Sequence, residues 1–333
     1  MATMTLPGWL APYLDLMRGK AGPAQQQAVL RQLVWPLLGI ALFLLLWHWA
    51  AQNIQTSLGQ FPGPATVWEQ AQALYQEHRQ GRQREAAFHE RQEKYIETRL
   101  AQQPDWQPVR RDYTGAPTFF DQVGTSLITV MSGFLLASAL AIPLGIVVGL
   151  SAGVHASVNP LIQIFKPVSP LAWLPLVTMV VSAVYTSSDP WLAKSFLTSM
   201  FTVTLCCLWP TLLNTAVGVT SVSSDLTNVS RVLRLNAFEH VRRIVLPSAL
   251  PMMFTGLRLS LGIAWMVLIA AEMLAQNPGL GKFVWDEFQN GSSQSLGRIM
   301  VAVLVIGLIG FLLDRLMLAL QRFLVWDKSA AQR

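Results

Sequence analysis

Long apolar runs alternate with polar segments along most of this chain. A bilayer core about 30 Å thick requires roughly 20 apolar residues in a spanning α-helix. The runs that meet this length are 33–52, 126–151, 158–185, 195–216, 253–275 and 298–321. The pattern predicts an all-α polytopic membrane protein with six transmembrane helices.

The composition supports that prediction. Charged residues make up 13% of the chain, about half of the roughly 25% typical of globular proteins. Hydrophobic residues make up 52%, so a soluble fold would leave much apolar surface in water. A disordered chain and a simple soluble enzyme are therefore excluded. The only cysteines, Cys206 and Cys207, are neighbours inside an apolar run, which predicts neither a disulfide framework nor a metal site.

Basic residues lie mostly at the ends of the apolar runs, which favours a membrane over nucleic acid as the partner. If the N-terminus is cytoplasmic, the cytoplasmic segments carry Arg18, Lys20, Arg31, Arg231, Arg234, Arg242, Arg243, Arg322, Lys328 and Arg333. The short outer loops then carry only Lys194 and Lys282. Because cytoplasmic loops are enriched in Lys and Arg, we expect both termini in the cytoplasm, with segments 1–32 and 323–333 on that side.

Segment 53–120 would then be extracytoplasmic. Its part 66–101 is rich in Ala, Gln, Glu and Arg, which are good helix formers. We predict a charged helical hairpin broken near Gly81. Two interpretations of the insertion 68–118 remain open: a solvated surface, or a contact site for a receptor.

The third apolar run contains Pro160, Pro167, Pro170 and Pro175. Proline removes backbone hydrogen bonds, and broken helices are tolerated at membrane depth where they pack in protein or line a watery cavity. We therefore assign Lys166, Ser169 and Trp173 to a translocation path for an anion. The alternative for Lys166 is that its ammonium group reaches the cytoplasmic face from a lipid-facing position.

Further ionisable residues fall inside the spans, where charges are costly and therefore pair or face a cavity. Arg258 is expected either to attract an anion on the translocation path or to form a structural ion pair. Glu272 lies near the outer end of its span, which favours gating or packing over substrate binding. Asp314 is expected to extend to the inner membrane surface.

The sequence carries no catalytic constellation. A GxxxxGK[ST] loop and an HExxH motif are absent, so no enzyme activity and no bound cofactor are predicted. An ATP-driven process would require ATP and Mg²⁺ on a separate ATPase chain.

The loop 217–250 is too long for a simple connector. Ser224 or Asp225 can begin a helix, and apolar residues then recur at helical spacing up to Leu235. A second short helix is predicted to end near Pro247. An amphipathic helix below the membrane fits a groove on a soluble partner, and resting on lipid headgroups is the alternative.

The end of this loop resembles the conserved loop of permeases from binding-protein-dependent ABC importers, which reads roughly EAA-x3-G-x9-I-x-L-P. Ile244, Leu246 and Pro247 match its end, whereas 228–230 (Asn-Val-Ser) occupy the EAA positions and Arg234 replaces the glycine. Segments 61–67 and 125–145 also resemble this family. Segments 166–175 and 255–274 are similar to its nitrate, taurine, sulfonate and bicarbonate branch, and the fifth-span stretch 255–274 looks most like nitrate permeases.

This resemblance implies a MetI-like type I permease fold with its core at 121–322, in the bacterial inner membrane. It also implies a homodimer with two cytoplasmic ATPases and a periplasmic binding protein. Its coupling residues would be Asp225, Asn228, Val229, Arg231, Val232, Arg234 and Leu235. Nitrate or nitrite is the expected substrate, with taurine, alkanesulfonates or bicarbonate as alternatives. A different class also remains open: an ATP-independent anion channel or secondary transporter.

Overall fold

The computed structural model shows a helical protein in two compact units, Met1–Glu69 and Gln70–Arg333, which we describe separately. It describes residues 23–56, 59–103, 105–186 and 191–324. Most of the predicted N-terminal segment and most of the predicted tail therefore lie outside the described residues.

The first unit is built on helix α2 (Pro23–Asn53), whose residues 34–53 are long and apolar enough to span a membrane. A short antiparallel pair of strands follows, β1 (Gln55–Thr56) and β2 (Gly59–Gln60). The chain folds back onto the helix end, since the indole nitrogen of Trp47 donates to the carbonyl of Pro62 at 3.0 Å. This helix agrees with the first predicted span.

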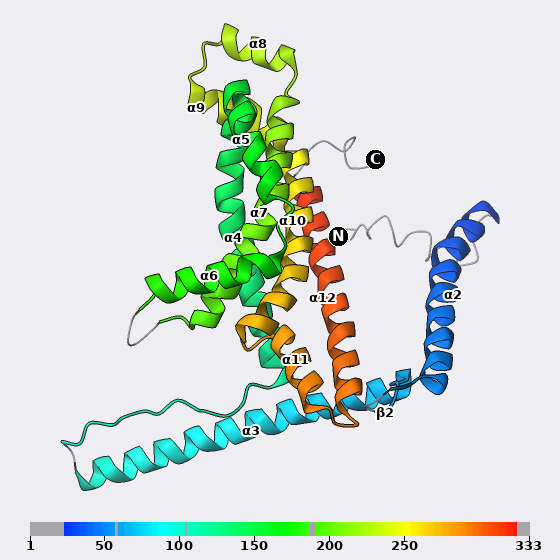
Figure 1. Cartoon of the computed structure of the whole chain (residues 1–333), viewed down its shortest axis with the longest axis vertical. Coiled ribbons are helices and arrows are strands. Elements are labelled where there is room, and N and C mark those ends of the chain that lie inside the picture. The colour runs from blue at the N-terminus through cyan, green and yellow to red at the C-terminus, as the bar shows by residue number, and fades with distance from the viewer. Residues whose placement is uncertain (1–22, 57–58, 104, 187–190, 325–333) are drawn as a thin grey trace, which may run out of the picture. The chain divides into compact units, whose positions relative to one another are not determined.

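The second unit contains the remaining helices (Figure 1). They are α3 (Pro64–Gln102, shared with the first unit), α4 (Phe119–Leu150), α5 (Ala152–Phe165), α6 (Pro170–Val184), α7 (Lys194–Thr220), α8 (Ser224–Val232), α9 (Ala237–His240), the π-turn η1 (Val241–Val245), α10 (Leu246–Ala275), α11 (Leu280–Asn290) and α12 (Ser295–Leu324). Within the described residues, five helices of the chain can span a membrane, or six if the bent pair α5 and α6 forms one span.

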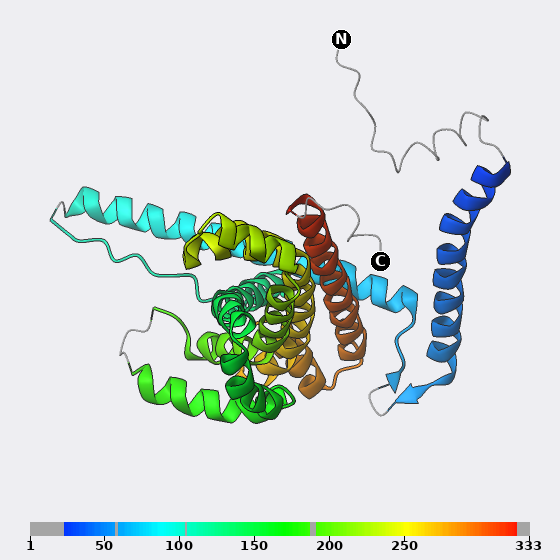
Figure 2. The same cartoon turned by 90° about the horizontal axis from the view of Figure 1, so that it is seen from above.

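Helices α4, α7 and α10 form the centre of this unit (Figures 1 and 2). Small residues let them approach closely, as is common between membrane helices. A Cβ atom on Gly145 of α4 would lie 2.7 Å from the carbonyl oxygen of Leu212 in α7. The buried hydroxyl of Thr211 in α7 donates to Ser260 Oγ in α10 at 2.8 Å. The centre is therefore held by close backbone contact and by paired hydroxyl groups.

The predicted helical hairpin broken near Gly81 is wrong. Helix α3 continues without interruption for 39 residues, because one glycine costs only about 1 kcal/mol and its neighbours favour a helix. A Cβ atom on Gly81 would lie 2.9 Å from Thr118 Cγ2. The glycine therefore makes room for the end of the returning segment and does not end the helix.

The predicted end of a short helix near Pro247 is also wrong. The chain passes from α9 through η1 directly into α10, and Pro247 lies in the first turn of α10. Proline is tolerated inside this continuous helical segment because a local π adjustment, here η1, can satisfy the backbone groups that proline leaves unpaired. The fifth span is consequently continuous with the loop that precedes it.

Candidate coupling and translocation sites

Helix α8 presents an apolar face to solvent. Ser223 caps its start, accepting a hydrogen bond from the Leu226 amide at 3.4 Å. Val229 is 48% exposed and Val232 is 82% exposed. Five large apolar side chains are exposed on α8, α9 (Ala237–His240) and the turn after α8: Leu226, Val229, Val232, Leu233 and Phe238. A helix with this face unburied in the single chain has the form expected of a docking element.

Arg234 occupies the left-handed backbone region, with φ of 46°. The Leu235 amide donates to the Ser230 carbonyl at 3.1 Å, and the Arg234 amide donates to the Arg231 carbonyl at 3.1 Å. These two bonds form a Schellman motif, in which the residue after the helix normally is glycine. The arginine therefore keeps the turn that the glycine of the resembled pattern would make.

The buried face of α8 is tied to the following helix. Ser230 is the buried residue of α8, and its Oγ lies 2.8 Å from Nδ1 of His240 in α9. Since α9 runs through η1 into α10, a displacement of α8 can reach a membrane-spanning helix through one hydrogen bond and a continuous backbone.

The predicted coupling residues gather on one short element. Asp225, Asn228, Val229, Arg231 and Val232 lie on α8, and Arg234 and Leu235 lie in the turn that ends it. All are exposed except Leu235, which is half-buried. The helix is shorter than predicted because the turn at Arg234 ends it at Val232.

The helix break predicted from the prolines is confirmed. Helix α5 ends at Phe165 and α6 begins at Pro170, with a bend of 100° between them. Ser169 caps α6, its Oγ accepting from the Leu171 amide at 3.3 Å. Lys166 lies exposed in the break and makes no ion pair with any described residue. The break thus places an exposed lysine beside the start of α6, and the assignment of Lys166, Ser169 and Trp173 to a translocation path stays a prediction.

Arg258 forms an ion pair with Asp314, so α10 and α12 are joined by two hydrogen bonds. Its Nη2 lies 3.0 Å from Asp314 Oδ2. Asp314 thus has a bidentate arginine as its partner within the helix pair, and its expected extension to the inner membrane surface stays a prediction. Of the two interpretations of Arg258, the structure contains the structural pair. The pair lines a small cavity with Leu261, Gly262, Trp265, Met266, Gly310 and Leu313.

Glu272 lies at the buried junction of α4, α10 and α11. The hydroxyl of Ser126 donates to its carboxylate at 2.8 Å, and the Gly281 amide donates at 3.0 Å. Ser126 Oγ in turn accepts from the Leu280 amide at 2.8 Å. This fully buried carboxylate joins three helices, an arrangement that serves packing. Helix α11 was not predicted, because its 11 residues are too few for a membrane span.

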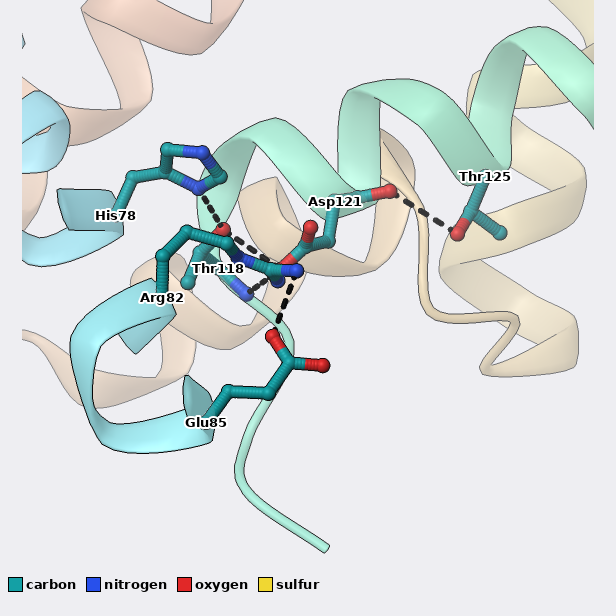
Figure 3. A network of polar contacts seen from close by, with 6 residues as sticks. All are labelled: His78, Arg82, Glu85, Thr118, Asp121 and Thr125. Carbon is teal, nitrogen blue, oxygen red and sulfur yellow. Dashed lines mark hydrogen bonds and ion pairs between the residues drawn. The ribbon is translucent and has the colours of Figure 1, made fainter. Parts of the chain in front are cut away.

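Helix α3 is fastened to the start of α4 by a polar network (Figure 3). Nδ1 of His78 lies 2.7 Å from Thr118 Oγ1, and Arg82 donates to Asp121 Oδ2 at 2.7 Å. Asp121 also accepts from the Thr118 amide at 2.9 Å, which completes a capping box at the start of α4. The inserted helix is therefore fixed to the transport core by specific side chains.

A second network fastens α3 to α11 and α12. Arg298 at the start of α12 pairs with Glu77 of α3 and donates to Glu287 of α11 at 2.9 Å. Glu287 also accepts from the buried hydroxyl of Ser295 at 2.9 Å. None of these pairings was predicted, because they join segments far apart in sequence.

The apolar spanning helices, their close packing and the unburied α8 together define a multi-pass membrane permease. Residues 141–325 match the family described as the binding-protein-dependent transport system inner membrane component. The chain therefore belongs to this family of inner-membrane ABC importer permeases.

Two curated relatives support the assignment. The nitrate import permease NrtB of Synechococcus elongatus is 36% identical over 208 residues, which cover 60% of this chain and 71% of that protein. The bicarbonate transport system permease CmpB of a Synechocystis strain is 30% identical over 294 residues, which cover 87% of this chain and 88% of that protein.

A solved structure supports the fold. The MetNI methionine ABC transporter in an inward-facing conformation matches with a TM-score of 0.53 and 13% identity, covering 62% of this chain and 95% of the matched chain. The predicted MetI-like permease fold is thereby confirmed.

Proposed function

We propose that this chain is the transmembrane subunit of an ATP-driven importer for a small anion, with nitrate or nitrite as its substrate. The observation that carries the proposal is α8: an exposed apolar helix, closed by a turn at the position where the family pattern has glycine. Two copies of the chain would form the pore, two cytoplasmic ATPases would bind their α8 helices, and a periplasmic binding protein would deliver the anion.

In this mechanism ATP and Mg²⁺ bind to the partner ATPases, and this chain supplies the moving permease. Closure of the ATPases would displace α8, and the contact of Ser230 with His240 would pass the movement to α10. The pore would then alternate between inward-open and outward-open states. ATP favours one state because the closed ATPase pair binds it more tightly.

This function sets the orientation of the chain. Contact with cytoplasmic ATPases requires α8 at the cytoplasmic side, which places α11 and the polar networks of α3 at the opposite side (Figure 1). If the bent pair α5 and α6 counts as one span, the described part of the chain has six candidate spans, and both termini would lie in the cytoplasm. This agrees with the distribution of Lys and Arg in the sequence.

Nitrate is preferred as the substrate because the fifth-span sequence resembles nitrate permeases and NrtB is among the relatives. Bicarbonate is the second candidate, since the CmpB relative aligns over 88% of its own length. Both are small planar monoanions, so the same basic path could serve either.

The test is ATP-dependent uptake of ¹⁵N-nitrate into proteoliposomes that contain this chain, its cognate ATPase and its binding protein. We expect uptake that requires ATP and is lost when the ATPase is omitted. Uptake that persists without ATP and follows an ion gradient would identify an autonomous channel or secondary transporter. Uptake of ¹⁴C-bicarbonate, taurine or an alkanesulfonate without uptake of nitrate would change the substrate and keep the architecture.

A further inference from the structure

Two tryptophan side chains beside the helix break carry buried indole N–H groups without a partner. They are Trp173 in the first turn of α6 and Trp209 in α7. Neither indole nitrogen is exposed, and neither has a hydrogen-bond acceptor within the described part of the chain. A buried donor left unpaired is costly, and such groups in native proteins call for an explanation such as a bound water or ion.

Both indoles belong to one aromatic cluster at the end of α5. The ring of Trp173 lies 5.9 Å from the ring of Phe165, measured between centroids, and the ring of Trp209 stacks on Phe165 at 6.5 Å with 6° between the planes. Lys166, which has no ion pair with a described residue, follows Phe165 directly in the chain. The two indoles with unpaired donors therefore contact the same ring, that of Phe165, and an exposed lysine is the next residue in the chain.

The two donors differ from other tryptophans of the chain. The indole nitrogen of Trp265 in α10 donates to the carbonyl of Ile306 at 3.0 Å, and that of Trp47 donates to Pro62. Among the described residues, the buried indole nitrogens without a partner are those of Trp173 and Trp209, and both belong to the cluster at the break.

We propose that Lys166, Trp173 and Trp209 form an anion subsite at the break between α5 and α6, selective for an anion that only accepts hydrogen bonds. This deepens the proposed function and rests on it. The ammonium group and both indoles can only donate, and no described carboxylate pairs with any of them. Nitrate has only acceptor oxygens, whereas bicarbonate carries an O–H that this donor set would leave unpaired.

The preference for nitrate over bicarbonate follows from the O–H group that only bicarbonate carries. An O–H buried without an acceptor weakens binding by about tenfold or more. A site of donors therefore favours nitrate over bicarbonate without any difference in size or net charge. Loss of one indole N–H that bonds a charged ligand should also weaken nitrate binding by about tenfold.

Indole N–H resonances give a direct test. The full-length permease would be labelled with ¹⁵N-tryptophan and placed in lipid nanodiscs. The variants Trp173→Phe, Trp209→Phe and Trp265→Phe would assign three signals by their disappearance, with Trp265 as the control. Sodium nitrate and sodium bicarbonate would then be titrated at constant ionic strength.

We expect nitrate to shift the Trp173 and Trp209 signals saturably and to leave the Trp265 signal in place. Bicarbonate should require about tenfold higher concentration, and Lys166→Gln should raise the nitrate midpoint. Unmoved Trp173 and Trp209 signals, equal movement of Trp265, or equal midpoints for the two anions would overturn the subsite.

The outcome separates this inference from the proposed function. ATP-driven nitrate uptake by a complex whose indole signals do not move would reject the subsite and keep the importer. Saturable movement in a complex that imports neither anion would keep the subsite and reject the proposed transport function.

Discussion

Ser230 Oγ lies 2.8 Å from Nδ1 of His240, and this contact connects the buried side of α8 to the helix that continues into α10. Ser230 is 5% exposed, while the opposite face of α8 carries Val232 at 82% exposure. One face of the same helix is thus available to a partner and the other is attached to the membrane core. This is the arrangement that a coupling element requires.

Replacing Ser230 with alanine should therefore reduce coupling. The variant loses a hydrogen bond worth about 1 kcal/mol and leaves the His240 ring without that partner. We expect fewer anions transported per ATP hydrolysed in proteoliposomes. The matched control is Thr227→Ala, because Thr227 bonds only within the first turn of the same helix, to the Ser223 carbonyl. An unchanged transport-to-hydrolysis ratio in Ser230→Ala would remove the proposed connection.

A second prediction concerns the backbone at Arg234. A non-glycine residue with φ of 46° is strained by about 1 kcal/mol relative to glycine. Arg234→Gly should fold with equal or higher stability and keep the turn. Arg234→Val should lower the melting temperature, since a β-branched residue is disfavoured at positive φ. Thermal unfolding of the purified permease measures both. A lower melting temperature for the glycine variant than for the valine variant would contradict this account of the turn.

The sequence predicted the elements whose signal is local. The apolar runs predicted the spanning helices, and the prolines predicted the break between α5 and α6. Pro167 lies in the break and Pro170 begins α6, whereas Pro160 and Pro175 lie inside their helices. In each case a short stretch of residues carries the physical cause.

Features that depend on distant partners could not be predicted. Arg82 pairs with Asp121, Arg298 pairs with Glu77 across 221 positions, and Arg258 pairs with Asp314. Such pairings depend on which helices pack together, which hydropathy does not specify. Trp209 was likewise missed, because an indole in an apolar run resembles an ordinary core residue. Only the structure shows that its nitrogen is buried without a partner.

The ion pairs of Arg298 predict unequal effects on stability. Its partner Glu287 is nearly buried, with 8% of the side chain exposed, while Glu77 is 56% exposed. Arg298→Ala would leave a buried carboxylate uncompensated and should destabilise the fold by about 3 kcal/mol. Glu77→Gln should cost less than about 1 kcal/mol, as for exposed ion pairs. Denaturation midpoints measure both changes, and equal midpoints would show that Glu287 does not depend on Arg298.

Substitutions at Glu272 and Gly281 should produce a packing defect at the junction of α4, α10 and α11. Glu272→Ala would leave the Ser126 hydroxyl and the Gly281 amide without their acceptor, at a cost of about 1–3 kcal/mol. Gly281→Ala should also destabilise, because its Cβ atom would lie 2.9 Å from Glu272 Cβ and would contact the Ile269 carbonyl oxygen. Yield and melting temperature of the purified permease report both effects. Wild-type stability in both variants would argue against a structural role for this junction.

The proposed coupling of ATP hydrolysis to transport through α8 is tested by placing charges on the exposed apolar face of that helix. Val229→Asp with Val232→Asp places two charges on the exposed apolar face of α8. Val109→Asp is the control, because Val109 is also 73% exposed and lies in the segment that returns from α3. Nitrate uptake and ATPase retention would be measured in proteoliposomes with the cognate ATPase and binding protein. We predict that the α8 variant loses its ATPase and at least about tenfold of its uptake, while the control retains both. An α8 variant that retains its ATPase and transports nitrate at the wild-type rate would contradict the account.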